Sequence, residues 1–183
     1  MHFITHAKQI AMKTSELTQT EYFEYYKPYV ALVGDLSLVA ALENGLVETK
    51  RFFNDIIPSE KHLYQYSIGK WTPKEILLHL IDTERVFCYR AMFFARDQGS
   101  SLGGFDENIF GVNCNANGRT MVDLLIEYIA VRSASICLFQ SFDKAALKQG
   151  GMANNQPLSA RAAGFIICGH EIHHKNVIKE RYL

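Results

Sequence analysis

The sequence predicts an all-α protein, a four-helix bundle whose helices run up, down, down and up. Four long segments repeat their apolar residues with the period of an amphipathic helix. No segment shows the strict alternation of apolar and polar residues that is typical of a half-buried strand. The longest connection separates the second helix from the third, so it can recross the bundle and let those two helices run parallel.

The first predicted helix covers about residues 36–56. Asp35 precedes it and is expected to cap its N-terminus, because a carboxylate can accept hydrogen bonds from the first free backbone amides. Pro58 ends it, since proline lacks the backbone N–H that the helix needs. One apolar stripe runs along this segment, made of Leu38, Leu42, Leu46, Phe53 and Ile57.

The second helix, residues 73–96, has the clearest start. Thr72 is expected at the N-cap, Pro73 at the first helical position and Glu75 at the third, which completes a capping box. We expect the Glu75 side chain to have only this capping role.

The remaining helices are less sharply bounded. The third is predicted at about residues 120–142, after the Gly-, Ser- and Asn-rich connection 97–118. The fourth begins near residue 159, after Pro157, and continues to about residue 182. A shorter helix is expected near residues 21–29, packed on the bundle.

Length and composition indicate one globular domain. The chain has 183 residues, of which 48% are hydrophobic and 21% charged, and its net charge is zero. A neutral chain argues against nucleic-acid or anionic-membrane partners, and no apolar run approaches the roughly 20 residues of a membrane span. We expect a bundle over residues 35–183, preceded by an aromatic-rich extension over residues 1–34.

The cysteines favour a reducing compartment. Cys88, Cys114, Cys137 and Cys168 are far apart in the sequence and are expected to be buried free thiols. The first 13 residues have neither the apolar core nor the cleavage site of a signal peptide. The sequence therefore predicts a cytoplasmic protein.

Three histidines suggest a metal site. His170 and His174 are four residues apart, so they lie on one face of the fourth helix, which is the spacing of a helical pair of metal ligands. His79, in the second helix, is the best third ligand. A lone helical histidine is more often a hydrogen-bonded structural residue, so the hypothesis depends on all three converging. Three other histidines have no second possible ligand at a spacing suited to metal binding and are expected at the surface: His2, His6 and His62.

A competing interpretation uses the same residues. From His170 to His174 the sequence also spells H-E-x-x-H, in which Glu171 would be the general base of a zinc protease. Zinc proteases of this class take the third ligand of their metal from a residue well downstream of the motif. Only Glu180 follows His174 as a possible ligand, and its helical position points elsewhere. We therefore expect Glu171 not to act as a base.

Three motifs, in order, resemble the DinB/YfiT-like superfamily. They are WTPKEILLHLIDTER at residues 71–85, LGGFDE at 102–107 and GHEIHH at 169–174. Gly103 stands where that family commonly has proline. The resemblance covers about residues 36–183.

The resemblance implies a four-helix bundle that holds a divalent metal on His79, His170 and His174, with the adjacent His173 not a ligand. Members with known activity are often S-transferases or isomerases that use low-molecular-weight thiols. Others are described only as metal-dependent hydrolases, and many members are dimers.

The sequence therefore predicts a metal-dependent enzyme that transfers a small thiol and acts on a small-molecule substrate. The alternatives are hydrolysis by metal-bound water, or a metal-stabilised stress-response or binding module without turnover. Three imidazoles suit Zn, Ni, Fe or Cu. Asp82, one turn beyond His79, is expected to play a polar role in the site, for example by orienting an imidazole. Glu84 and Arg85 are expected in surface or interhelix pairs.

The aromatic segment 21–29 carries four tyrosines and one phenylalanine. Such a density of aromatic residues is expected to pack on something, because large apolar patches are rare on monomers. It either covers the open end of its own bundle or contributes to a homodimer contact, where aromatic residues are enriched. We expect a homodimer overall.

Overall fold

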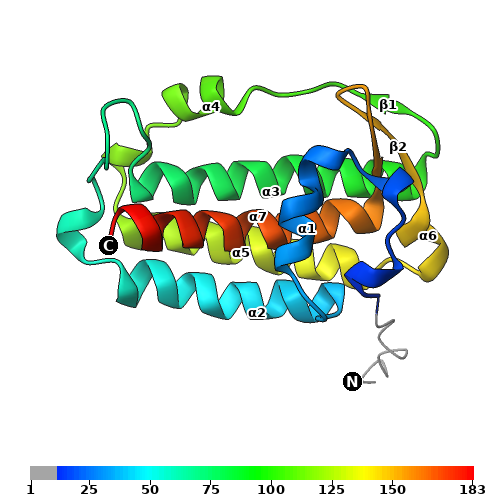
Figure 1. The fold of residues 1–183 in the computed structure, drawn as a ribbon, viewed down its shortest axis with the longest axis horizontal. Coiled ribbons are helices and arrows are strands. Elements are labelled where there is room, and N and C mark those ends of the chain that lie inside the picture. Colours follow the sequence, from blue (N-terminus) through cyan, green and yellow to red (C-terminus); the bar gives the residue numbers. More distant parts are fainter. Residues whose placement is uncertain (1–11) are drawn as a thin grey trace, which may run out of the picture.

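Four long helices form the bundle in the computed structural model, which describes residues 12–183. They are α2 (Leu38–Arg51), α3 (Pro73–Arg96), α5 (Met121–Gln140) and α7 (Ala160–Arg181). In Figure 1, α2 and α7 run in one direction while α3 and α5 run in the other, which confirms the up-down-down-up order. Both α5 and α7 pack against α2 and α3, so α2 and α3 occupy opposite corners.

The long connection between α3 and α5 crosses back along the whole bundle, as predicted (Figure 1). It is more structured than expected, since it contains β1 (Ser101–Leu102), α4 (Glu107–Asn113) and a 3₁₀ turn at Ala116–Gly118. This crossover lies over α3, where it covers one side of the site described below.

The expectation that strands are absent is wrong in one place. After the short helix α6 (Lys144–Lys148), a hairpin of β2 (Gly150–Ala153) and β3 (Gln156–Ser159) forms a three-stranded sheet with β1. Its turn places Asn154 and Asn155 at positive φ, 52° and 59°, as a two-residue type I′ turn requires. Strands of two to four residues are too short to show an alternating pattern.

Helix capping follows the sequence closely at α3. The Thr72 hydroxyl accepts from the Glu75 amide at 3.2 Å, and the Glu75 carboxylate accepts from the Thr72 amide at 2.7 Å, so the predicted capping box is confirmed. The prediction for Asp35 is wrong, because α2 begins two residues later, after Ser37. A π-helical turn at Phe52–Ile56 extends α2 up to Pro58, as expected.

A buried charge network joins all four bundle helices. Arg132 of α5 donates from Nε and Nη2 to the two carboxylate oxygens of Glu84 on α3, at 2.8 and 2.9 Å. It also donates to Glu171 of α7 at 2.7 Å and to the Leu42 carbonyl of α2 at 3.2 Å. Each of the three charged side chains is at most 3% exposed. The expected interhelix pair of Glu84 is thereby confirmed.

Two apolar clusters lie on either side of this network along the bundle, one containing Leu42 and Phe87, the other Leu77 and Tyr128. The Tyr128 hydroxyl lies 2.6 Å from Glu171, and Gly45 lets α2 approach so closely that a Cβ there would overlap the Arg132 guanidinium. The network therefore fixes how the four helices sit at the middle of the bundle.

The N-terminal segment packs on its own bundle, as expected. Two 3₁₀ turns, Gln19–Glu21 and Glu24–Tyr26, lead into α1 (Lys27–Leu32), which packs across α7 (Figure 1). This helix lies against the side of α7 and not over an end of the bundle. The homodimer stays a prediction.

Several smaller expectations concern single side chains. The four cysteines are free thiols, but only Cys168 is buried as expected: Cys88 and Cys114 are half-buried and Cys137 is exposed. His62 is half-buried and not a surface residue. His2 and His6 lie outside the described residues. None of the described helices has the length and apolarity needed to cross a membrane.

Candidate metal centre

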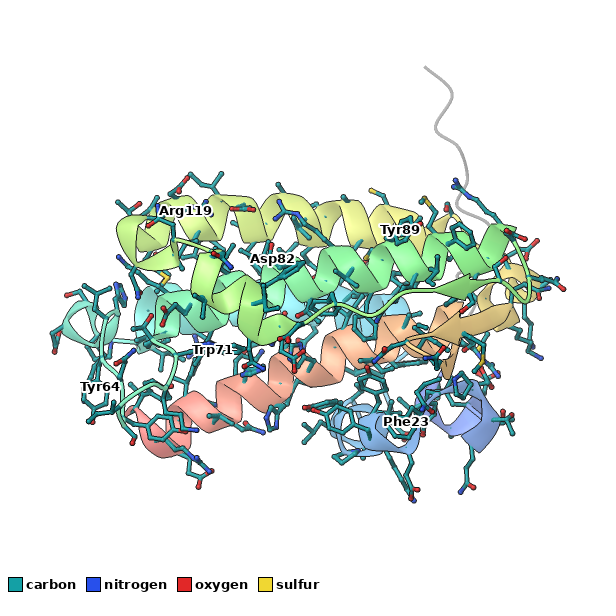
Figure 2. The ribbon with its side chains drawn as sticks, turned by 90° about the horizontal axis from the view of Figure 1, so that it is seen from above. Phe23, Tyr64, Trp71, Asp82, Tyr89 and Arg119 are labelled. Atoms are coloured by element: carbon teal, nitrogen blue, oxygen red, sulfur yellow. The ribbon has the colours of Figure 1, made fainter. Side chains whose placement is uncertain are left out.

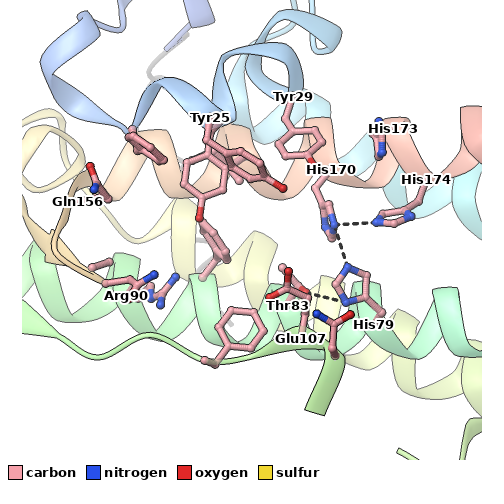
Figure 3. Close-up of a pocket in the computed structure, with 18 of the residues that line it drawn as sticks. Tyr25, Tyr29, His79, Thr83, Arg90, Glu107, Gln156, His170, His173 and His174 are labelled. Carbon is pink, nitrogen blue, oxygen red and sulfur yellow. Dashed lines mark hydrogen bonds between the residues drawn. The ribbon is translucent and has the colours of Figure 1, made fainter. Parts of the chain in front are cut away.

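The three predicted histidines meet because α3 and α7 are antiparallel neighbours. His79 lies in the second turn of α3, while His170 lies at the middle of α7 and His174 one turn later, at the same height as His79 (Figure 3). The His170 Nε2 atom is 3.0 Å from the His79 Nε2 and 2.9 Å from the His174 Nε2. No other group of three or more possible metal ligands occurs within residues 12–183.

This geometry suits one divalent ion. Nitrogen ligands about 2.0–2.1 Å from a tetrahedral zinc lie about 3.3 Å apart, only slightly farther than the distances found between the neighbouring Nε2 atoms. The Nδ1 atom of His174 is buried without a hydrogen-bond partner among the described residues. The polar contact of this ring is therefore made by its Nε2 atom, the one that faces the cluster. His173 contacts the Tyr29 ring instead, with centroids 5.2 Å apart, and is not part of the cluster.

Burial keeps the three imidazoles neutral. It lowers the pKa of His79 to about 4 and that of His174 to about 3, the latter also through the neighbouring His79. The pKa of His170, which is only 9% exposed, is lowered well below its usual value by burial and by both neighbours. Neutral rings present free lone pairs at pH 7, which is the form that binds metals.

Asp82 does not contact the histidines. Its carboxylate accepts from Arg85 at 3.3 Å, and Figure 2 places it on the α5 side of α3, away from α7. The nearest partner of the His79 Nδ1 is the Thr83 hydroxyl at 3.5 Å, while Trp71 stacks on the ring with centroids 4.6 Å apart. The expected pairing of Arg85 is confirmed, since it also bridges to Glu127 of α5 at 2.6 Å. A role for Asp82 in the site stays a prediction.

Glu171 lies away from the three histidine nitrogens, in the buried charge network. Its carboxylate is held by Arg132 and Tyr128, and Lys175 lies 3.5 Å from it. A base that activates water must face the metal, so this placement argues against the zinc-protease interpretation.

The histidine cluster opens into a cavity of about 480 Å³. Five parts of the chain line it: the N-terminal segment, α3, the crossover, the β2–β3 hairpin and α7 (Figure 3). The walls are rich in aromatic rings, namely Phe23, Tyr25, Tyr26, Tyr29, Trp71, Phe87 and Phe105. Such a cavity gives a small molecule access to the open side of the cluster.

Two charged residues of this cavity were not singled out from the sequence. Glu107, the first residue of α4, lines the cavity together with His79. Arg90, three turns after His79 on the same face of α3, lies at the other end (Figure 3). The spacing of eleven residues could have indicated Arg90, whereas Glu107 depends on the path of the crossover.

The N-terminal cover depends on Gly169. A Cβ at this position would overlap the carbonyl of Tyr29, so only glycine lets α1 lie against α7 beside the site. Replacing Gly169 with alanine should push α1 outward and lower the free energy of unfolding by about 1–3 kcal/mol, the usual cost of overpacking.

Urea denaturation would measure this loss, with Asn176→Ala, an exposed site on the same helix, as the control. A stability equal to that of the control would show that α1 does not lie where the structure places it.

The fold and the site together define a helical-bundle protein with a three-histidine cluster facing an aromatic cavity. The chain belongs to the DinB superfamily, whose family model matches residues 41–178. Its structure is similar to that of YfiT from Bacillus subtilis, with a TM-score of 0.69, 14% sequence identity and 90% of each chain covered. YfiT is described as a probable metal-dependent hydrolase with an unusual four-helix bundle topology. No curated protein shows significant similarity to this chain.

Proposed function

We propose that this protein is a metal-dependent enzyme in which His79, His170 and His174 hold one divalent ion and a small-molecule substrate binds in the adjoining cavity. The observation that carries this proposal is the convergence of the three Nε2 atoms at the wall of an open cavity. A structural zinc site is normally closed by four protein ligands, whereas three ligands with an open side are typical of catalytic sites.

A bound ion would lower the pKa of a nucleophile, water or a thiol, at its open position. The chain's own residues supply the rest. Trp71 and Thr83 fix the ring of His79, and the aromatic walls exclude bulk water from the reacting groups. Glu107 is the one carboxylate among the residues that line the cavity, so it is our candidate to accept a proton from the nucleophile.

Hydrolysis is the reaction class that we favour. Glu107 supports it, because a water nucleophile must lose a proton to a base, and so does the description of YfiT. Transfer of a small thiol is the second candidate, supported by the sequence resemblance: a thiol bound to a metal is already deprotonated and needs no base. The two reactions therefore differ in their dependence on Glu107.

Replacing Glu107 with glutamine should separate them. Full-length protein loaded with Zn, Ni, Fe or Mn would be assayed against panels of esters, amides and phosphoesters, with and without several small thiols. We expect metal-dependent hydrolysis that falls about 10²–10⁴-fold in Glu107→Gln, the usual contribution of a general base. Asp106→Asn, which alters the neighbouring residue, is the control.

Turnover that requires a thiol and survives Glu107→Gln would replace hydrolysis by thiol transfer. Full metal binding without turnover on either panel would instead support a metal-stabilised binding module.

A further inference from the structure

Arg90 is the one buried arginine that lacks a carboxylate partner among the described residues. The structure buries three arginines, Arg90, Arg132 and Arg161, each at most 4% exposed. Arg132 pairs with two carboxylates and Arg161 pairs with Glu21, whereas Arg90 pairs with none. Removing a charge from water without a partner is unfavourable, so an unpaired buried cation needs an explanation.

The guanidinium of Arg90 is held in place with most of its donors free. It makes one hydrogen bond, from Nη2 to the Gly103 carbonyl at 3.1 Å. Its carbon lies 5.2 Å from the centroid of the Phe87 ring and 5.7 Å from that of Phe105. An arginine has five N–H donors, so four are left for a ligand.

These donors belong to the cavity that contains the histidine cluster. Arg90 lies at the end away from His79, and Gln156 of the hairpin lies at the same end as Arg90 (Figure 3). Eleven residues separate His79 from Arg90, which places their Cα atoms about 16 Å apart along one face of α3. A small molecule could therefore have its reacting group at the histidines and a second polar group at Arg90.

The charge of the cavity indicates the class of that second group. Arg90 is the sole arginine or lysine among the described lining residues, and Glu107 lies beside His79, away from it. One planar guanidinium matches one carboxylate through paired hydrogen bonds. A doubly charged phosphate would have only this one cation beside it at the Arg90 end of the cavity.

We propose that Arg90 binds a carboxylate of the substrate, so that this protein acts on small carboxylic acids or their derivatives whose carboxylate lies several bonds from the reacting group. This inference rests on the proposed function in taking the cavity as the substrate site.

Calorimetric titration with three matched probes tests it: hydrocinnamate, the neutral hydrocinnamide and phenethyl phosphate. Full-length metal-loaded protein should bind hydrocinnamate at least about tenfold more tightly than the amide, as expected for a hydrogen bond to a charged group. Arg90→Gln should abolish this preference, Arg90→Lys should keep part of it, and Arg96→Gln, exposed on the same helix, should leave it unchanged.

The variant His170→Ala separates this inference from the proposed metal site, because a carboxylate can also bind a metal ion. An Arg90-dependent preference that persists in His170→Ala supports the inference even if no metal-dependent activity is found. A preference that survives Arg90→Gln and disappears in His170→Ala would show that the carboxylate binds the metal and would overturn the inference.

Two further results would also overturn it. One is tighter, Arg90-dependent binding of phenethyl phosphate, which would indicate a phosphate ligand. The other is the absence of any carboxylate preference in the wild-type protein, which would leave Arg90 as an anchor for the crossover through Gly103.

Discussion

Replacing Arg132 with methionine should lower the free energy of unfolding by about 3–5 kcal/mol, because it leaves the buried Glu84 without a cation and Glu171 with only the longer contact to Lys175. Glu84 and Glu171 are both 2% exposed, and Arg132 donates directly to each. Together with the bond to the Leu42 carbonyl, these contacts link α5 to the three other bundle helices. Chemical denaturation followed by circular dichroism would measure the loss.

The pH dependence of stability should become weaker in the same variant. In the wild type, burial alone would raise the pKa of Glu171, but Arg132, Lys175 and the Tyr128 hydrogen bond lower it overall. A lowered pKa in the folded state contributes stability above the unfolded pKa, and this stability is lost as the pH falls through the folded value. Without Arg132 the strongest of these lowering influences is lost, so less stability should be lost as the pH falls than in the wild type.

A triple variant provides the control. Changing Glu84 and Glu171 to apolar residues together with Arg132→Met removes all three charges and should recover most of the lost stability, since apolar replacements of a buried charge triad can be neutral or stabilising. A single Arg132→Met variant as stable as the wild type would contradict the buried network.

Replacing His170 with alanine should abolish metal binding. His170 lies between the other two imidazoles, within 3.0 Å of both Nε2 atoms, so its loss removes the central ligand and leaves two that are farther apart. A metal bound only by the native state stabilises it by about 4 kcal/mol when the free metal is a thousand times its Kd. The wild type should show this as a rise in Tm on adding zinc, and the variant should not.

The matched control is His173→Ala, which removes the adjacent histidine that packs against Tyr29 and His174 but offers no nitrogen to the cluster. It should keep the metal-dependent rise in Tm. A rise that survives His170→Ala but disappears in His173→Ala would move the metal site away from the three-histidine cluster.

The sequence predicted those features that depend on one segment at a time. The start of α3 follows from Thr72 and Glu75 alone, and the His170–His174 pair follows from helical spacing. Their meeting with His79 needed one further step, the antiparallel packing of α3 on α7, and the long crossover made that topology predictable.

Features that depend on several distant segments could not be predicted in this way. Arg132 is one charged residue on an amphipathic helix, and nothing in its neighbourhood shows that Glu84 and Glu171 approach it from two other helices. Arg90 is similar, because its environment comes from Phe105 of the crossover and from the hairpin. The N-terminal cover depends on how Gly169 meets a backbone carbonyl far away in the sequence.

X-ray absorption spectroscopy of the zinc-loaded protein tests the central claim most directly, because it counts the ligands of the bound metal and identifies their atoms. We expect one zinc per chain with three imidazole nitrogens about 2.0–2.1 Å from it, completed by a light atom from solvent. Replacing His79 or His174 with alanine should reduce the imidazole count. A sulfur ligand at about 2.3 Å, or a wild-type spectrum unchanged by both substitutions, would contradict a metal centre built on His79, His170 and His174.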